Sequence, residues 1–356
     1  MTGEDRQPRS DIRGVVRGSA PAPLSILDLA TVGAGYTAGQ ALEATTDLAR
    51  TAERLGYHRF WVAEHHGMPG VASSTPAVLL AHLGAHTSTL RLGSGGVMLP
   101  NHAPLAVAEQ FGLLEALHPG RIDLGLGRAP GTDPATARAL RRGSLEDGEE
   151  FPRQLSELTH FLDGDFPTGH PYARLSAVPN GPQRPPIWLL GSSGFSAQLA
   201  GRLGLPFAFA HHFSAANTVP ALELYRSSFR PSDVLDEPYA LIGVSAVAVP
   251  DGGLEAARHL ARSAALGMLR LRRGMPTAIP TPQEAADHPY SPAEEDFVES
   301  WMANVVMGEP GRVADGLEEL RKRTGADELM VTSHFHGHEA RLRSYELIAE
   351  AYGLSG

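Results

Sequence analysis

The feature that most constrains the fold is a repeated alternation of short apolar segments with longer helical ones along the 356 residues. The short segments are bounded by glycine or proline, which is typical of strands buried on both faces. We expect strands over 24–30, 59–63, 90–99, 121–126, 186–190, 207–210, 239–249 and 328–331. Eight such units predict a (β/α)8 TIM barrel; an open, doubly wound parallel sheet is the main alternative.

Helices are expected between these strands. One over 38–55 ends at Gly56, and one over 104–117 begins with proline, as helix starts and ends prefer. The charged stretch 133–162 predicts two helices. The stretch 274–292 follows the seventh strand, has many prolines and few periodic apolar positions, and is expected to be a mobile loop.

Composition limits the domain organisation and the chemistry. Residues 1–22 are polar and rich in Arg, Gly and Pro, so we expect a disordered extension before a single domain over 23–356. The chain has no cysteine, which excludes disulfides, thiolate nucleophiles and cysteine–metal sites. Its formal net charge of −10 opposes electrostatic binding to nucleic acid or anionic membrane. Neither a membrane-length apolar run nor a signal-peptide core is visible, so the cytoplasm is the expected location.

Polar clusters follow six of the expected strands, and barrel enzymes carry their sites at these strand ends. A single histidine there is more often a structural hydrogen-bonding group than a catalyst, but six clusters together favour a site. The histidines fit acid–base and polar binding work. A metal site is the competing interpretation, although Glu64 and Glu339 are the only carboxylates beside the histidines. The clusters are Glu64-His65-His66, Asn101-His102, Arg128, 191–194, His211-His212 and 333–338.

The turn Gly191-Ser192-Ser193-Gly194 joins the fifth strand to a helix. Small residues let backbone N–H groups approach an anion, the start of a helix is partly positive, and serine hydroxyls add donors. Arg128, which follows the preceding strand, could complete a phosphate site with charge-assisted hydrogen bonds. A plain strand–helix turn with a serine N-cap is the alternative.

Two other signatures do not fit. The glycines over 125–131 have the wrong spacing for a dinucleotide-binding loop, and Pro130 stands where its last glycine would be. The Gly-x-Ser-x-Gly motif of hydrolases is absent near these serines.

Five segments, taken in their order and spacing, resemble the bacterial luciferase-like flavin monooxygenases. The resemblance covers about Leu24 to Gly353 and is closer to homologues without an assigned substrate than to light-emitting luciferase subunits. The segments are 61–66 (WVAEHH), 92–100 (LGSGGVMLP), 108–110 (AEQ), 119–128 (PGRIDLGLGR) and 187–193 (IWLLGSS).

The resemblance implies a role for each site residue. His65 would be the catalytic histidine beside the flavin ring, with Glu64 and His66 next to it. The segment 274–292 would be a mobile lid, and no metal is implied. The implied FMN-binding residues are Gly95 and Gly96, which would form a non-proline cis peptide against the ring, Glu109 on the following helix, and Arg128, Gly191, Ser192, Ser193 and Ser196 around the phosphate.

Two departures from the luciferase pattern argue against light emission and a long-chain aldehyde substrate. The histidine expected directly before the proline of the third helix is replaced by Ala103, with His102 one residue earlier, and a carboxylate of the phosphate site is replaced by Ser192.

The resulting hypothesis is a monooxygenase that uses reduced FMN and oxygen on a small organic substrate. A separate flavin reductase would be a transient partner, because no nicotinamide motif is visible. A homodimer through helices near the second and third strands is also implied. The alternatives are deazaflavin-dependent hydride transfer, a non-catalytic flavin-binding protein and a metal hydrolase.

Overall fold

The computed structural model describes residues 12–141, 150–179 and 183–354. Within them, parallel strands pair in chain order, and the last strand pairs with both β1 and β8, which closes the sheet into an eight-stranded barrel. The expected TIM barrel is confirmed, and the open sheet is excluded. The barrel strands are β1 (Leu24–Asp28), β2 (Arg59–Val62), β3 (Arg91–Ser94), β5 (Ile122–Gly127), β6 (Ile187–Gly191), β7 (Phe207–Ala210), β8 (Ala240–Ala248) and β10 (Glu328–Thr332).

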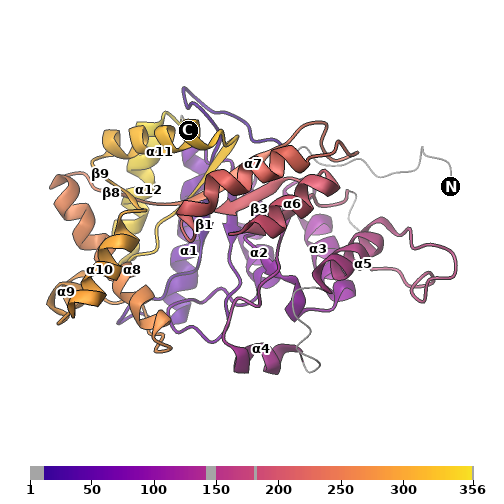
Figure 1. The fold of residues 1–356 in the computed structure, drawn as a ribbon, viewed down its shortest axis with the longest axis horizontal. Helices are drawn as coiled ribbons and strands as arrows, with labels where there is room; N and C mark the ends of the chain where they lie inside the picture. Colours follow the sequence, from indigo (N-terminus) through magenta and orange to yellow (C-terminus); the bar gives the residue numbers. More distant parts are fainter. Residues whose placement is uncertain (1–11, 142–149, 180–182, 355–356) are drawn as a thin grey trace.

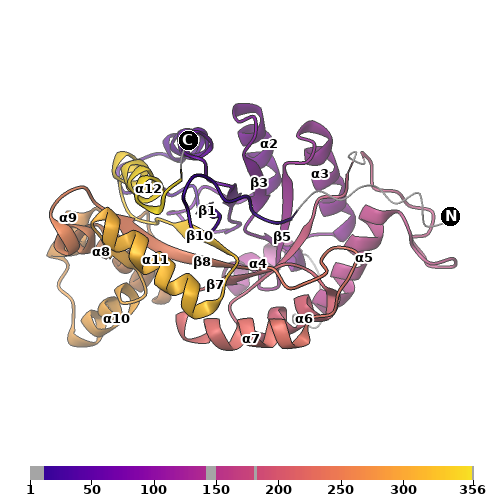
Figure 2. The same ribbon diagram turned by 90° about the horizontal axis from the view of Figure 1, so that it is seen from above.

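Helices surround the strands, and three of the described helices, α8, α9 and α10, lie together at one end of the molecule (Figures 1 and 2). Two short strands, β4 (Val97–Met98) and β9 (Val306–Gly308), pair in parallel with β5 and β8. The helices are α1 (Ala38–Leu55), α2 (Pro76–His86), α3 (Pro104–Leu117), α4 (Pro134–Arg141), α5 (Phe151–Asp163), α6 (Gly194–Leu203), α7 (Thr218–Ser228), α8 (Gly253–Arg272), α9 (Pro282–Asp287), α10 (Pro292–Met302), α11 (Pro310–Thr324) and α12 (His338–Tyr352), with 3-10 turns at Leu99–Asn101 and Ala215–Asn217.

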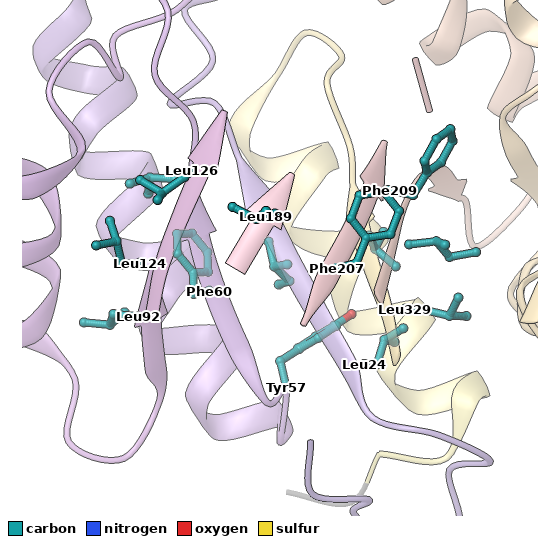
Figure 3. Close-up of a cluster of buried hydrophobic side chains, with 14 of the residues drawn as sticks. Leu24, Tyr57, Phe60, Leu92, Leu124, Leu126, Leu189, Phe207, Phe209 and Leu329 are labelled. Carbon is teal, nitrogen blue, oxygen red and sulfur yellow. The ribbon is translucent and has the colours of Figure 1, made fainter. Parts of the chain in front are cut away.

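Alternate residues of each strand face opposite sides of the barrel wall. Phe60, Leu92 and Phe207 belong to the cluster that packs against the helices, as Figure 3 shows. Trp61 and Trp188 belong to a second cluster, built from the opposite strand faces, inside the barrel. The same alternation, continued past each strand end, decides which polar side chains face the mouth of the barrel.

The segment before β1 differs from its expected disorder. Ile12 is 5% exposed, its carbonyl accepts a hydrogen bond of 2.5 Å from the Arg59 guanidinium, and Gly14 N–H donates to Tyr239 Oη. Residues 12–22 therefore close the base of the barrel, and the expectation was wrong for them because these contacts form only once the barrel exists. Residues 1–11 lie outside the described residues.

Two further features differ from the expected elements. The expected third strand is divided into β3 and β4 at Gly95–Gly96. The expected loop 274–292 contains the short helix α9, and its Ile279 is buried and pairs through its backbone with Val32 and Ala34 after β1. None of the described helices combines the length and the apolar character that crossing a membrane requires.

Candidate active site

Three histidines reach the mouth of the barrel from the ends of β2, β7 and β10. His65, His212 and His334 continue the inward-facing phase of these strands, and each is partly exposed. They lie near one another, since a charge on His65 lowers the pKa of both His212 and His334. The mouth is therefore lined by imidazoles from three distant parts of the sequence.

Backbone carbonyls fix the tautomer of two of these imidazoles. His65 Nδ1 lies 3.0 Å from Gly131 O, and His212 Nδ1 lies 3.0 Å from Gly243 O. A carbonyl can only accept, so both Nδ1 atoms carry the proton, and each Nε2 keeps its lone pair. Burial lowers the pKa of both imidazoles, which are therefore neutral near pH 7.

His334 is less constrained. Its Nδ1 lies 2.9 Å from Thr31 Oγ1, and a hydroxyl can either donate or accept. Burial, followed by the nearby Arg341 charge, lowers the pKa of His334 to about 4. It is neutral near pH 7, and its exposed nitrogen can be either a donor or an acceptor.

Glu64 is fully buried and holds the end of β2 to the segment after β3. Its carboxylate accepts hydrogen bonds from Met98 N–H at 3.0 Å, His66 Nε2 at 3.0 Å and His102 Nε2 at 2.8 Å. Burial opposes ionisation, but the hydrogen bonds from His102 and His66 lower the pKa of Glu64. Of the three residues expected to be catalytic, His65 faces the mouth. The other two, Glu64 and His66, are hydrogen-bonded to each other.

The expected phosphate-binding residues meet at the start of α6. The Arg128 guanidinium lies 4.4 Å from the ring centroid of Phe195 in the first turn of this helix, and it makes no ion pair with any described carboxylate. Ser193 is the N-cap, but its hydroxyl makes no capping bond. The alternative that Ser193 only caps the helix therefore does not account for its hydroxyl. The guanidinium, the serine hydroxyls and the first N–H groups of the helix are available to bind an anion.

The other members of the expected phosphate site share this corner. Gly191 ends β6, Ser192 is partly exposed, and Ser196 is buried in the first turns of α6. Glu109 lies partly exposed on α3, and its carboxylate makes no hydrogen bond or ion pair with another described residue.

The Gly95–Gly96 pair directly follows β3, which lies between β2 and β5 in the barrel. A Cβ on Gly96 would lie 2.8 Å from Gly125 O, so only glycine fits against the neighbouring strand. The cis bond implied by the resemblance is present.

The family model for luciferase-like monooxygenases matches residues 23–328. The chain belongs to the luciferase-like monooxygenase family. It is 53% identical over 329 residues to the uncharacterized protein YvbT of Bacillus subtilis (strain 168), covering 92% of this chain and 96% of that protein. It is 47% identical over 323 residues to a luciferase-like monooxygenase of Escherichia coli (strain K12), covering 91% and 95%. The crystal structure of apo-MsnO8 superposes with a TM-score of 0.84 at 40% identity, covering 94% and 99%.

More distant members of this fold differ in cofactor. The oxygenating constituent of 3,6-diketocamphane monooxygenase from Pseudomonas putida, a Baeyer–Villiger enzyme in complex with FMN, has a TM-score of 0.68 at 18% identity. An F420-dependent secondary alcohol dehydrogenase has a TM-score of 0.65 at 15% identity. At these identities they show that the luciferase-like chain shares their fold and no more.

The remaining histidine clusters of this family member are engaged elsewhere. His211 faces outward and bonds Thr218 Oγ1 at 2.7 Å, while His336 bonds Ala34 O at 2.9 Å. Among the described residues, no group of three or more histidines and carboxylates converges on a point that could hold a metal ion. Sequence reasoning placed His212 and His334 in strand-end clusters without assigning either a role, although counting alternate residues from Ala208 or Met330 directs both to the mouth.

Proposed function

We propose that this protein is an FMN-dependent monooxygenase that uses reduced FMN and oxygen to oxygenate a small organic substrate. Family membership supports the reaction class. Arg128 and the N-terminus of α6 support a phosphorylated cofactor. A guanidinium without a described carboxylate partner, next to free helix N–H groups, can bind a phosphate dianion.

Two groups of residues would bind different parts of the cofactor, one the phosphate and the other the flavin ring. Arg128, the serines at 192, 193 and 196, and the backbone from Gly191 would hold the phosphate. The Gly95–Gly96 backbone would lie against the flavin ring, with Glu109 as a further contact. When bound, reduced FMN would supply the electrons that activate oxygen, and a separate flavin reductase would supply FMN in this state.

His65 would move a proton at Nε2. Its Nδ1–H is tied to Gly131 O, so the free Nε2 lone pair can accept a proton and return it without turning the ring. Glu64 would act through position, because it fastens the end of β2 to Met98 N–H and so holds the neighbouring His65 in place. The segment with Ile279, which pairs with the loop after β1, would exclude water as a lid.

The observation that carries the proposal is the placement of Arg128 over Phe195 at the α6 N-terminus. We expect Arg128→Ala to weaken FMN binding about 10- to 100-fold, as the loss of charge-assisted hydrogen bonds to phosphate implies. Riboflavin, which lacks the phosphate, should bind both proteins alike. Quenching of flavin fluorescence measures both affinities.

Arg202→Ala is the matched control, because it removes the same charge from the last turn of the same helix. FMN affinity that is unchanged in Arg128→Ala, or reduced equally in both variants, would rule out the phosphate site. Oxygen consumption with a flavin reductase and NADH then tests the monooxygenase reaction itself.

Deazaflavin-dependent hydride transfer is the second candidate, since the fold also occurs in an F420-dependent dehydrogenase and the same corner could take a phosphate-bearing deazaflavin. Parallel titrations with FMN and F420 separate the two. Bound, reduced FMN that consumes no oxygen would favour the non-catalytic flavin-binding alternative.

A homodimer in the cytoplasm completes the proposal. The apolar residues of α2 and α3 are spread around the helices, as in helices covered on all sides. Yet Val78 is 69% exposed, Leu113 47% and Leu117 55%. We expect a second copy to cover this surface, which sedimentation of wild type and Leu117→Glu would test.

A further inference from the structure

His212 is not among the residues proposed to hold the cofactor, and a hydrogen bond fixes its imidazole at the mouth. Its Nδ1–H donates to Gly243 O at 3.0 Å, on the neighbouring strand. The ring packs against the Gly243 backbone, where a Cβ would lie 2.9 Å from Nδ1. The sequence thus provides both the anchoring carbonyl and the space for the ring.

The Nε2 atom of His212 is unused within the described structure. It makes no hydrogen bond with a described residue, and it is not among the buried polar atoms that lack a partner, so it faces accessible space. His65 is in the same situation, with its Nδ1 tied to Gly131 O. The mouth therefore presents two fixed lone pairs, one from each imidazole.

Burial lowers the pKa of His212 most, and a charge on His65 lowers it further, while the hydrogen bond to Gly243 O acts in the opposite direction. The other side chains coupled to His212 by charge are also imidazoles, those of His334 and His211. Of the cations on this side of the barrel, Arg341 is ion-paired with Asp28, and Arg128 lies at the α6 N-terminus, where it would hold the cofactor phosphate. With Arg128 so occupied, a carboxylate substrate would meet the two imidazole lone pairs.

We propose that His212 is a substrate-binding residue whose Nε2, together with that of His65, accepts hydrogen bonds from the O–H or N–H groups of an uncharged substrate. A phenol, alcohol or amide has the required donor. His334 adapts to the remaining polar group, because its bond to Thr31 Oγ1 permits either tautomer. The inference rests on the proposed function in so far as the mouth is where the substrate reacts.

The test uses the full chain labelled with ¹⁵N-histidine, with and without FMN. Long-range ¹H–¹⁵N spectra at pH 7, assigned with His212→Gln, distinguish a protonated from an unprotonated Nε2. We expect the His212 Nε2 signal to be that of a lone-pair nitrogen and to shift when phenol is added. Benzoate, of similar size but charged, should leave it in place.

Variants test the acceptor itself. His212→Phe keeps a ring and should weaken phenol binding about 2- to 10-fold, as the loss of one neutral hydrogen bond implies. His212→Gln keeps an acceptor at the tip and should recover most of this loss. His211→Phe is the matched control, since the adjacent imidazole faces Thr218 outside the barrel and should not affect phenol binding.

A protonated Nε2 on His212, a signal that phenol does not move, or an equal response to benzoate would overturn the inference. The FMN titrations separate it from the proposed function. Protein that fails to bind FMN but shows the phenol response overturns the proposed function and supports the inference. Protein that binds FMN without the response overturns the inference alone.

Discussion

The two ends of the barrel bury polar groups in opposite ways. At the base, Arg59 pairs with Asp123 at 2.9 Å and with Glu328 at 2.8 Å, and all three side chains are 0% exposed. Tyr239 donates a further bond of 2.9 Å to Glu328. At the mouth, the imidazoles are uncharged, partly exposed and bonded through one nitrogen only.

The difference separates structure from function. At the base, Arg59, Asp123 and Glu328 each have an opposite charge within hydrogen-bond distance. Burial alone would raise the pKa of Asp123, but Arg91 and Arg59 lower it strongly. These charges neutralise one another and close the barrel, so none of the three is left for a ligand. At the mouth, free polar atoms persist although unmade hydrogen bonds are costly, which is expected where a ligand completes them.

The largest effect should come from breaking the base. Arg59→Met leaves Glu328 buried without its cation and Asp123 with Arg91 alone, and we expect a loss of about 3–5 kcal/mol in the free energy of unfolding. Urea denaturation followed by tryptophan fluorescence measures it. At urea concentrations where the variant stays folded, its affinity for FMN should be unchanged.

Arg128→Ala is the control at the mouth. Its guanidinium is exposed and lacks a described carboxylate partner, so its removal should change stability by less than about 0.5 kcal/mol. Equal destabilisation by both variants would mean that the two ends do not differ as described.

The same contrast explains what the sequence could predict. The bounds of α3 follow from Pro104 at its start, and the barrel follows from the alternation of strands and helices. The three-residue strand β9 and the short helix α9 are too brief to show a period. The order of residues 12–22 depends on the Arg59 side chain, which is distant in sequence.

The site was partly predictable for a related reason. Arg128 and the α6 turn could be predicted as a phosphate site because the chemistry of phosphate binding is local to a helix start. His212 could not be distinguished from His211 by composition, because strand phase alone places one inside the barrel and the other outside.

Acidification should destabilise the folded protein, because histidines that are buried and neutral at both ends of the barrel must become charged. Burial lowers the pKa of His334 at the mouth, and of His58 beside Arg59 at the base, to about 4. The unfolded chain therefore binds more protons below about pH 6.5, and stability should fall from there to pH 4.5. We expect a loss of roughly 2 kcal/mol per histidine at pH 5.

Urea midpoints at pH 7, 6 and 5 for wild type, His334→Gln and His58→Gln measure this dependence. Each variant should lose less stability on acidification than wild type does. Glu115 and Asp327, whose pKa values burial raises, act in the opposite direction and are common to all three proteins. A wild-type stability that is constant from pH 7 to 5 would contradict the neutral state of the histidines.

The smallest effect compares two helix starts on the mouth side. Thr37 caps α1 in a reciprocal box with Gln40, whereas Ser193 makes no capping bond at α6. Thr37→Ala should therefore cost about 1 kcal/mol of stability, and Ser193→Ala less than about 0.3 kcal/mol. In FMN titrations the order should reverse, with Ser193→Ala weakening binding and Thr37→Ala leaving it unchanged. If Ser193→Ala instead destabilised the apoprotein as much as Thr37→Ala does, the Ser193 hydroxyl would be capping the helix. It could then not be counted as a donor in the proposed phosphate site.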